Sequence, residues 1–539
     1  MKVLTADQMR EVDRLTTEAF KMPGLLLMER AAASVVEAIE RGFAPLVGKS
    51  VLVVCGRGNN GGDGAAVARL LREKVDSVDL LLLGRAADAR GDARTNFEIA
   101  RTLAAEGGRL RLVEIDSLDN LRQEFDARAH DLIIDAIFGT GLSRPATGIF
   151  EEAINLINRR SAGSSIVAVD IPSGLAADSP QLIGPAVRAH LTVTFTAPKI
   201  ASVLPPASDY SGALRVAMIG SPDELVTSSG SRLTLTERDT IAHWLVRSRR
   251  SPHANKGSVG RVLIVAGSRG KTGAAALAGE AALRAGAGLV TVASAESVQP
   301  VIASLVTPEC MTESLAETTA GTVAREAADK IFELAGARDV VAVGPGLGSG
   351  QESTRELVRA LVVKRERPTV IDADGLNSLA PWPEELRGTK EAPLILTPHP
   401  GEMSRLIDKQ VPEVLERGVE VARDLARSRE LIVVLKGSRT LIAAPDGEVY
   451  INPTGNAGMA TGGTGDVLTG IIAAFVAQGP DDPVAAVRAA VYLHGLAGDR
   501  AASLVGTRAM IASDISRHLG EAFIEIGGDD ERFRRRDAV

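Results

Sequence analysis

Cysteine, aromatic residues and surplus positive charge are all scarce in this chain of 539 residues. Its two cysteines, Cys55 and Cys310, lie far apart in the sequence and can form neither a disulfide framework nor a zinc site, so both are expected to be free thiols in a reducing compartment. The formal net charge of −7 provides no long-range attraction to nucleic acid or to an anionic membrane. We therefore expect no nucleic-acid partner, and any phosphate ligand has to be held by local amides and a few cations.

Long apolar runs are also missing. Residues 1–10 are polar and contain no apolar signal core, and no uninterrupted apolar stretch approaches the roughly 20 residues of a membrane span. These absences favour a cytoplasmic protein without a membrane partner.

Short apolar runs, glycine-rich turns and helical stretches are abundant instead. With 54 glycines, 45% hydrophobic residues and only 3% aromatics, the composition is typical of α/β layers. Apolar runs alternate with helical patterns, which predicts βαβ units, largely parallel sheets and ligands at the carboxyl ends of the strands. The predicted strands cover residues 51–55, 78–83, 132–134, 166–169, 191–195 and 214–218 in the first half, and 262–266, 289–292, 340–343, 369–371, 394–396 and 431–435 in the second.

The length and one change of composition predict two domains. A chain of 539 residues exceeds a single hydrophobic core. Residues 221–233 are polar and turn-rich, which is typical of a linker. We predict one domain over residues 1–220, the linker over 221–233, a second domain over 234–525 and a frayed tail over 526–539.

Residues 452–466 form the most informative segment. Their sequence, Asn-Pro-Thr-Gly-Asn-Ala-Gly-Met-Ala-Thr-Gly-Gly-Thr-Gly-Asp, crowds glycine and threonine before an apolar helical pattern. Such a turn lets backbone N–H groups converge on an anion at the positive end of the helix dipole. Gly463, Thr464 and Gly465 are predicted to hold a phosphoryl group, with Asp466 as the acid or base. The simpler alternative is a turn in which Asp466 only caps the helix.

Two other glycine-rich segments allow different interpretations. Residues 56–61 read Gly-Arg-Gly-Asn-Asn-Gly after a strand, as in NAD-dependent dehydrogenases, but the second strand ends in Gly84-Arg85 without an acid for the ribose. Residues 267–272 are similar to a P-loop, but Val265 occupies the position of its first glycine. Both interpretations are disfavoured.

Segment 452–466 resembles the phosphate-binding signature of the ribokinase-like carbohydrate kinases. Together with residues 255–290, 397–402 and 436–440, it makes the second half similar to the ADP-dependent NAD(P)H-hydrate dehydratases. Residues 59–63, Asn-Asn-Gly-Gly-Asp, make the first half similar to the NAD(P)H-hydrate epimerases that are often fused to them. The resemblance covers nearly all of residues 1–520. It implies a Rossmann-like three-layer sandwich followed by a ribokinase-like α/β domain.

For the first domain, the resemblance implies a site for the hydrated nucleotides NADHX and NADPHX, with a potassium ion bound by Asn60, Asp135 and Ser173. Inversion at C6 requires a group that cycles a proton, and Asp170 is the candidate; its alternative role is a cap or an ion ligand. The implied substrate contacts are Asn59, Asn60, Gly61, Gly62, Asp63, Gly139, Thr140, Gly141, Leu142, Ser143, Arg144, Pro145 and Asp170.

For the second domain, the resemblance implies that ADP phosphorylates the C6 hydroxyl and that phosphate then leaves. Asp466 would take the hydroxyl proton, and His399 with Glu402 would face the nicotinamide nucleotide or a magnesium ion. Asp372 and Asp374 follow a strand, and one of them is expected only to cap a turn. No role is assigned to His253, because the usual His-Lys-Gly of this family reads His-Ala-Asn-Lys-Gly here. Nucleotide contacts are expected from Lys436, Gly437, Ser438, Arg439, Thr440, Gly463, Thr464 and Gly465, and substrate contacts from Ala287, Gly346, His399 and Asp466.

The sequence thus predicts a homo-oligomeric repair enzyme that epimerises the R and S hydrates and dehydrates the S form while ADP becomes AMP and phosphate. One alternative is an ATP-dependent kinase of a vitamin precursor such as a thiazole or pyrimidine alcohol. Another is a non-catalytic nucleotide-binding scaffold. The motifs of the first domain argue against the kinase, and the presence of both Asp170 and Asp466 argues against the scaffold.

Overall fold

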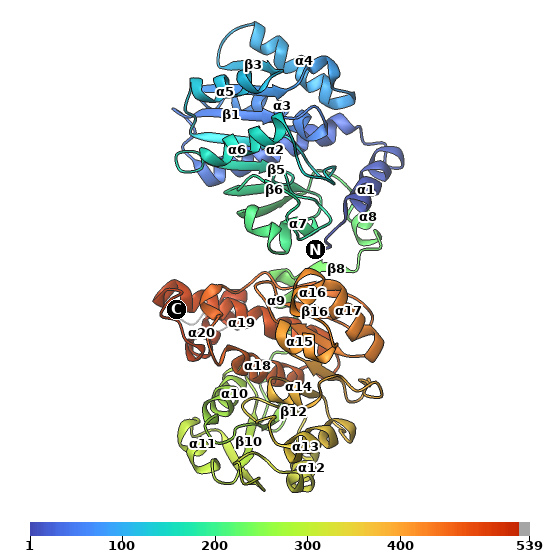
Figure 1. Cartoon of the computed structure of the whole chain (residues 1–539), viewed down its shortest axis with the longest axis vertical. Helices are drawn as coiled ribbons and strands as arrows, with labels where there is room; N and C mark the ends of the chain where they lie inside the picture. Colours follow the sequence, from blue (N-terminus) through green and yellow to red (C-terminus); the bar gives the residue numbers. More distant parts are fainter. Residues whose placement is uncertain (528–539) are drawn as a thin grey trace. The chain divides into compact units, whose positions relative to one another are not determined.

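The computed structural model describes residues 1–527 and divides the chain into two compact units (Figure 1). The N-terminal unit is Met1–Leu233 and the C-terminal unit starts at Thr234. Within the segment predicted as a linker, residues 223–227 form helix α8 (Asp223–Thr227) of the N-terminal unit. Most of the predicted tail, from residue 528 on, lies outside the described residues.

The N-terminal unit is built on a seven-stranded parallel sheet in the order β3-β2-β1-β4-β5-β6-β7. The direction in which successive strands are added reverses between β1 and β4, and such a switch point opens a crevice at the carboxyl ends of the strands. The strands are β1 (Ser50–Cys55), β2 (Ser77–Leu83), β3 (Leu110–Ile115), β4 (Leu132–Ala136), β5 (Ser165–Val169), β6 (Leu191–Phe195) and β7 (Ala213–Ala217).

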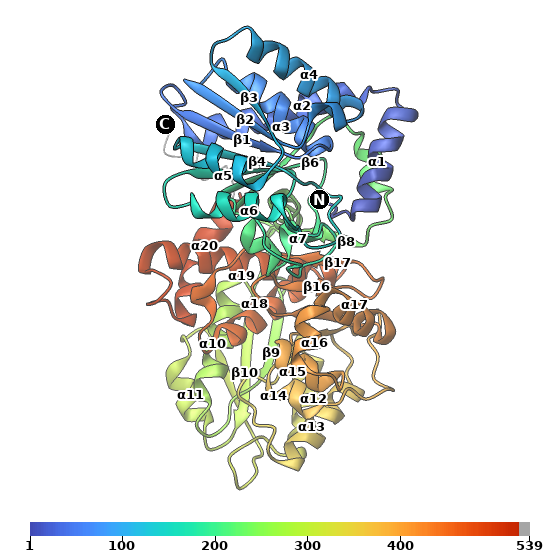
Figure 2. The ribbon, with the colours of Figure 1, turned by 45° about the horizontal axis from the view of Figure 1, so that its top comes forward.

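Helices cover both faces of this sheet (Figure 2). Side chains alternate along β1, so that Val53 and Cys55 pack on one face while Leu52 and Val54 pack on the other. The first face carries α2 (Gly24–Phe43), α3 (Asn59–Leu71) and α4 (Gly91–Ala105); the second carries α5 (Leu118–Ala127) and α6 (Ile149–Arg159). The predicted three-layer sandwich is confirmed. Two further helices are α1 (Ala6–Glu18) and α7 (Ile200–Val203).

The C-terminal unit contains a ten-stranded sheet in the order β11-β10-β9-β12-β13-β14-β15-β16-β17-β8. Strands from β11 to β15 in this order are parallel, and β16 and β17 add antiparallel neighbours. The strands are β8 (Leu233–Leu235), β9 (Arg261–Val265), β10 (Leu289–Ala295), β11 (Met311–Leu315), β12 (Val340–Val343), β13 (Thr369–Ile371), β14 (Leu394–Leu396), β15 (Ile432–Leu435), β16 (Leu441–Ala443) and β17 (Val449–Ile451).

Two helices of this unit pack tightly against each other, α10 (Thr272–Arg284) and α18 (Thr464–Gln478). A Cβ atom at Gly470 would lie 2.2 Å from the Ala278 carbonyl oxygen, so only glycine allows this approach. Helix α18 also contacts β9, β12 and β13, which explains why it is apolar almost all round. The other helices include α9 (Arg238–Arg247), α11 (Gln299–Leu305), α12 (Ala328–Gly336), α13 (Glu352–Val363), α14 (Asp374–Ser378), α15 (Pro400–Leu406), α16 (Val411–Glu416), α17 (Gly418–Arg429), α19 (Pro483–Val505) and α20 (Ala512–Ile526).

Every predicted strand is present, with ends that match or shift by at most three residues. Five further strands were not predicted: β3, β8, β11, β16 and β17. β3 and β11 carry charged residues and lie at sheet edges, and the other three have three residues each, too short to show a period.

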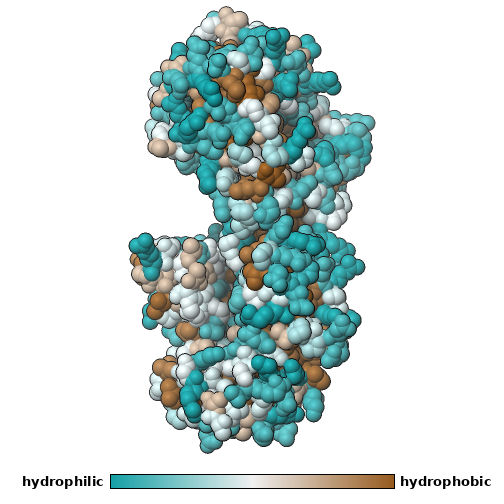
Figure 3. All heavy atoms as spheres, in the orientation of Figure 1, coloured by the Kyte–Doolittle hydropathy of each residue, from teal (hydrophilic) through white to brown (hydrophobic). Residues whose placement is uncertain are grey.

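The surface agrees with the sequence on one further point. Within residues 1–527, no helix combines the length and apolar character needed to cross a bilayer. Figure 3 shows a viewed face that is mostly hydrophilic, with apolar residues in small separate groups.

Candidate active sites

The site of the N-terminal unit lies at the carboxyl ends of β1, β4 and β5. Residues 59–63, the segment shared with the epimerases, form the start of helix α3. A Cβ atom at Gly61 would lie 1.8 Å from the Gly56 carbonyl oxygen, and one at Gly62 would lie 2.6 Å from the Ala93 Cα atom. These two glycines therefore let the start of the helix pack against the end of β1 and against α4.

Asn60 carries an unsatisfied amide into this crevice. The residue is 8% exposed, and neither Oδ1 nor Nδ2 has a hydrogen-bond partner among the described residues. Buried polar groups are normally paired, so such an orphan points to a ligand. A Cβ atom at Gly139 would lie 3.4 Å from Asn60 Cβ and 3.3 Å from Asp170 Oδ2. The predicted residues Asn60, Gly139 and Asp170 thus converge.

Asp135 and Ser173 lie together at the ends of β4 and β5. The Ser173 backbone N–H donates to Asp135 Oδ2 at 2.7 Å, and its hydroxyl donates to Asp135 Oδ1 at 2.5 Å. Burial raises the pKa of Asp135 to about 6, although the hydrogen bonds from Ser173 oppose that shift. The Phe138 N–H donates to Ser173 Oγ at 2.9 Å and ties the following loop to this pair.

Asp170 follows β5 in a strained conformation, with φ at +66°. Its Oδ1 accepts hydrogen bonds from Lys199 Nζ at 2.7 Å and from Thr194 Oγ1 at 3.0 Å. Lys199 is 1% exposed. The predicted proton carrier is thus paired with a buried cation that was not predicted.

Two more carboxyl groups interact with Asp170. Burial raises the pKa of Asp63 well above its ordinary value, and the charges of Asp170 and Asp13 add to the shift. Burial likewise raises the pKa of Asp13 to about 6, opposed by Lys199 and assisted by Asp170. Asp13 was missed because it lies on α1, about 160 residues from Asp170, and looks like an ordinary polar position of an amphipathic helix.

The predicted substrate contacts from residue 139 to residue 145 lie in the segment that connects β4 and α6. Thr140 and Leu142 are half-buried, while Gly141, Ser143, Arg144 and Pro145 are exposed. Arg144 is therefore accessible to an anionic ligand. No contact in the structure tests the roles predicted for Asn59 and for residues 140–145.

The site of the C-terminal unit is centred on the start of α18. Gly463 is the N-cap, with φ at +91° and no side-chain capping bond. Asp466 is the third residue of the helix, so it does not cap the helix as the alternative interpretation proposed. The first amides of a helix have no partner within the helix, so those of Thr464, Gly465 and Asp466 are positioned to bind an anion.

Carboxylates and one lysine surround this helix start. Lys436 Nζ donates to Asp372 Oδ1 at 2.7 Å and lies 3.7 Å from Glu402 Oε2. Thr469 Oγ1 donates to Asp372 Oδ2 at 2.8 Å. Burial alone would lower the pKa of Lys436, but Asp372, Glu402 and Asp466 together raise it. A Cβ atom at Gly465 would lie 3.3 Å from Lys436 Nζ, so the predicted lysine and glycine meet.

Asp466 has the protonation behaviour of a general base. Its pKa is raised from an ordinary value of 3.8 to about 6, first by burial and then by Asp372, while Lys436 opposes the shift. A base with a pKa near the working pH is ionised yet still accepts a proton effectively.

The loop after β12 lies beside the same site. Lys271 Nζ donates to Asp374 Oδ2 at 2.9 Å, and the Gly348 N–H donates to the same oxygen at 2.9 Å. Gly346 has φ at +60°, and its Cβ would lie 2.7 Å from the Lys271 carbonyl oxygen. Asp374 therefore organises this loop, whereas Asp372 contacts Lys436.

His399 has a structural contact that was not predicted. It is the N-cap of α15, where its Nδ1 accepts a hydrogen bond from the Gly401 N–H at 3.0 Å. Glu402 completes the capping box by accepting from the His399 N–H at 2.9 Å. The ring remains half exposed, so Nε2 can still reach a ligand.

Ala287 is not brought to this site. It precedes β10, so it lies at the amino edge of the sheet, while Gly346, Asp372, His399 and Lys436 follow their strands at the carboxyl edge. Its substrate contact remains a prediction without support from this placement. Residues 437–440 follow β15 and Lys436 at the carboxyl edge, where Arg439 donates to the Pro453 carbonyl oxygen and so contacts the glycine-rich segment; their nucleotide contacts remain a prediction.

Two residues of α19 support the glycine-rich segment and were missed. His494 Nε2 donates to the Thr464 carbonyl oxygen at 3.1 Å, and burial lowers the pKa of this histidine to about 4, so the ring is neutral. Asp499 accepts from the Gly455 N–H at 3.0 Å and from Asn456 Nδ2 at 2.9 Å. Both lie in a continuous helical pattern, which gives no local signal of this role.

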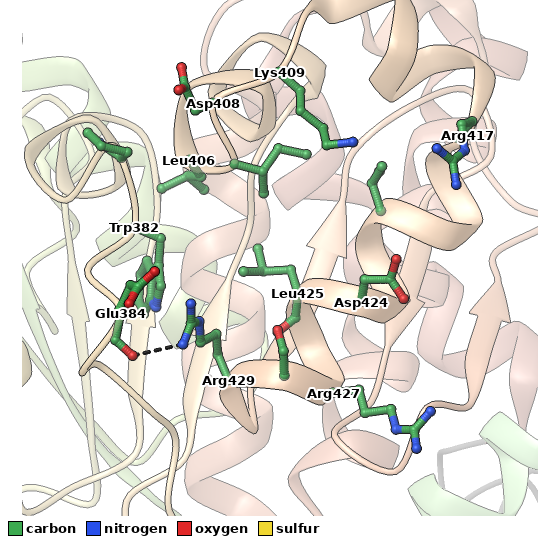
Figure 4. Close-up of a pocket in the computed structure, with 14 residues that line it drawn as sticks. Trp382, Glu384, Leu406, Asp408, Lys409, Arg417, Asp424, Leu425, Arg427 and Arg429 are labelled. Atoms are coloured by element: carbon green, nitrogen blue, oxygen red, sulfur yellow. Dashed lines mark hydrogen bonds between the residues drawn. The ribbon is translucent and has the colours of Figure 1, made fainter.

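A separate hollow of about 680 Å³ lies at the ends of α15 and α17 (Figure 4). Its lining includes Trp382, Leu406, Lys409 and Arg417, and Arg429 donates to the Glu384 carbonyl oxygen across one side. None of the predicted site residues lines this hollow.

Comparisons with known proteins cover both units. Residues 262–520 match the family model described as NAD(P)H-hydrate dehydratase, and residues 24–201 match the one described as YjeF-related protein N-terminus. The chain is 47% identical over 516 residues to a bifunctional NAD(P)H-hydrate repair enzyme of Moorella thermoacetica, covering 96% of this chain and 95% of the relative. It is 34% identical to the enzyme of that name from Escherichia coli, covering 95% and 92%. Among solved structures, an ADP/ATP-dependent NAD(P)H-hydrate dehydratase from Bacillus subtilis is 31% identical, with a TM-score of 0.46, covering 54% of this chain and 98% of that one.

Proposed function

The chain belongs to the family of bifunctional NAD(P)H-hydrate repair enzymes, and we propose which of its residues perform each of the two reactions. The N-terminal unit epimerises the hydrates at C6, and the C-terminal unit dehydrates one epimer to the reduced nicotinamide nucleotide. The observation that carries the assignment is the meeting of Asp466 with Lys436 and the unpaired amides at the start of α18.

In the N-terminal unit, Asp170 exchanges the proton of the C6 hydroxyl. The C6 hydrate is a hemiaminal, so removing this proton allows the C6–N1 bond to break, with N1 taking up a proton, and closure on the other face inverts the centre. The orphan amide of Asn60 and the exposed Arg144 support the binding of a polar, anionic nucleotide here.

In the C-terminal unit, Asp466 removes the proton of the C6 hydroxyl. The hydroxyl oxygen attacks the β-phosphoryl group of ADP at the same time, which releases AMP. The amides of Gly463, Thr464 and Gly465 and the ammonium of Lys436 stabilise the charge on the transferring group. Phosphate then leaves together with a proton from C5, which forms the double bond of the reduced nicotinamide. Phosphorylation of the C6 hydroxyl replaces hydroxide, a poor leaving group, with phosphate, the good leaving group that dehydration needs.

We propose one ion for each site. The orphan Oδ1 of Asn60, Asp135 and Ser173 Oγ offer only oxygen ligands, which suit a hard monovalent cation such as potassium. Glu402 and Asp374 offer carboxylates for magnesium on the phosphates of ADP, and this ion would neutralise charge on the transferring group when bound. In the structure, Lys271 Nζ lies 2.9 Å from Asp374 Oδ2 and Lys436 Nζ lies 3.7 Å from Glu402 Oε2.

The phosphoryl donor provides one test of the proposal. We expect repair of the S hydrate of NADH to proceed with ADP and to release AMP, and to be slower with ATP, because residues 452–466 and the motifs beside them resemble those of the ADP-dependent dehydratases. Nucleotide products separated by chromatography would report the donor. Rapid phosphorylation of a thiazole or pyrimidine alcohol with ATP, without hydrate repair, would favour the vitamin-precursor kinase instead.

The pH dependence of dehydration provides a second test. Asp466 must be ionised to act as a base, and its pKa is raised to about 6. With pure S hydrate and saturating ADP, kcat should therefore be flat above pH 7 and fall about tenfold for each pH unit well below 6. A rate that stays constant down to pH 4.5 would show that another group accepts the proton.

A further inference from the structure

Lys199 is a buried cation in the N-terminal site. It lies between β6 and α7 and is 1% exposed. Its Nζ donates to Asp170 Oδ1 at 2.7 Å, to Thr194 Oγ1 at 2.9 Å and to the Phe195 carbonyl oxygen at 3.1 Å. An ammonium group has three N–H donors and no acceptor, so all three donors are used. Lys199 is therefore held as a fixed positive charge and is poorly suited to carry protons.

The two oxygens of Asp170 are consequently different. Oδ1 accepts from both Lys199 and Thr194. Oδ2 accepts no hydrogen bond from any described residue, and it is the oxygen closest to the space beside Gly139. The pair thus orients the carboxylate so that its one free oxygen faces the crevice where Asn60 lies.

Lys199 offsets negative charge around Asp170. Burial and then the charge of Asp170 raise the pKa of Asp63 on α3, and burial raises the pKa of Asp13 on α1, where Lys199 opposes the shift and Asp170 adds to it. Within the group formed by Asp13, Asp63, Asp170 and Lys199, the one cation is Lys199. Burying an ion pair is seldom more stable than burying apolar residues of the same size, so stability alone does not account for it.

We propose that Lys199 is a positioning residue for epimerisation: it holds the Asp170 carboxylate by Oδ1 and leaves Oδ2 to exchange the substrate proton. Oδ2 takes the proton of the C6 hydroxyl while the C6–N1 bond breaks to give an aldehyde and N1 takes a proton from water. Closure on the other face of the aldehyde reverses both transfers, and Lys199 keeps its protons throughout. This inference rests on the proposed epimerase function of the unit.

The test compares Lys199→Met, Lys199→Arg and the control Lys49→Met in the full-length protein. Lys49 precedes β1 at the opposite edge of the sheet, and its Nζ donates to the Phe43 carbonyl oxygen at 2.7 Å. Interconversion of one pure epimer of hydrated NADH is followed by chromatography without ADP from pH 6 to 9. Misplacing a catalytic group by about an ångström can cost a hundredfold in rate. Because Lys199 holds Asp170 by Oδ1, Lys199→Met should lose about tenfold or more in kcat with KM little changed.

The split between kcat and KM, together with rescue by arginine, separates positioning from mere folding. The deficit of Lys199→Met should lie in kcat, because Lys199 contacts Asp170 and Thr194. Lys199→Arg should recover most of the rate at pH 6.5, and Lys49→Met should match wild type throughout. Thr194→Val, which removes one donor to Oδ1 but keeps the cation, should show a smaller deficit of the same kind.

Each other outcome has a defined meaning. A deficit in Lys199→Met that lies in KM, or no deficit, would overturn the inference, and so would a Lys199→Arg variant that melts like wild type but recovers no rate. If Lys199→Met does not fold, Thr194→Val and Lys199→Arg decide in the same way. If wild-type protein itself does not interconvert the epimers, the proposed function of the unit fails, and the Lys199 variants are then not needed to show it.

Discussion

Asp466→Asn is expected to lose about two or more orders of magnitude in ADP-dependent dehydration, the usual scale for removing a positioned base. The amide keeps the shape of the side chain and leaves the amides of Gly463 and Gly465 in place, so ADP should still bind. Turnover of the pure S hydrate of NADH, followed by its reduced-nicotinamide absorbance, measures the loss, and calorimetric titration with ADP measures binding.

The thermal stability of Asp466→Asn provides an independent test of the raised pKa of Asp466. Asp466 binds its proton more tightly in the folded protein, where its pKa is about 6, than at its ordinary value of 3.8. Its ionisation above pH 6 therefore destabilises the fold, while this cost is absent below about pH 4. Asp466→Asn should melt no lower than wild type at pH 7.

The control Asp239→Asn removes an exposed carboxylate from the first turn of α9 and should leave turnover unchanged. Near-wild-type turnover in Asp466→Asn would reject Asp466 as the base.

Asp170→Asn is expected to divide repair of a mixed hydrate sample into two phases. Asparagine tolerates the positive φ of residue 170, so the backbone should be retained. The C-terminal site should align only one epimer for phosphoryl transfer, because misplacement by about an ångström can cost a hundredfold. Repair with ADP should therefore stop at the fraction initially present as the usable epimer and then continue at the spontaneous epimerisation rate.

Two controls make this result specific. Asp119→Asn, which changes a 98% exposed carboxylate in the same unit, should repair the whole sample in one phase, like wild type. Asp466→Asn should equilibrate the epimers while repairing almost none. Rapid, complete repair by Asp170→Asn would show either that Asp170 is dispensable or that the C-terminal site accepts both epimers.

Most of the fold was predictable from the sequence because buried parallel strands are continuous apolar runs. Runs such as residues 51–55 and 340–343 appear as β1 and β12, and the polar ends of these runs mark the carboxyl edge where both sites lie. Asp135, Asp170, Asp372 and Lys436 follow or end such strands, which is why they could be identified as candidates. Edge strands such as β3 were missed, since their exposed faces carry charge.

The remaining site residues depend on tertiary contacts that no local pattern reveals. Lys199 could have been suspected as a charge just beyond β6, but its pairing with Asp170 depends on the neighbouring order of β5 and β6. Asp13 reaches the same cluster from α1, and His494 reaches Thr464 from the middle of α19. Conversely, Ala287 fits the family pattern in sequence, yet its position before β10 places it at the other edge of the sheet.

We propose that one chain repairs both epimers of a hydrated nucleotide and consumes ADP in doing so. The most direct measurement adds wild-type protein and excess ADP to a mixed sample of hydrated NADH and follows the reduced-nicotinamide absorbance together with AMP and phosphate. We predict that absorbance returns completely, with one AMP and one phosphate for each NADH formed. No return of absorbance, or a return that does not depend on added nucleotide, would contradict the account.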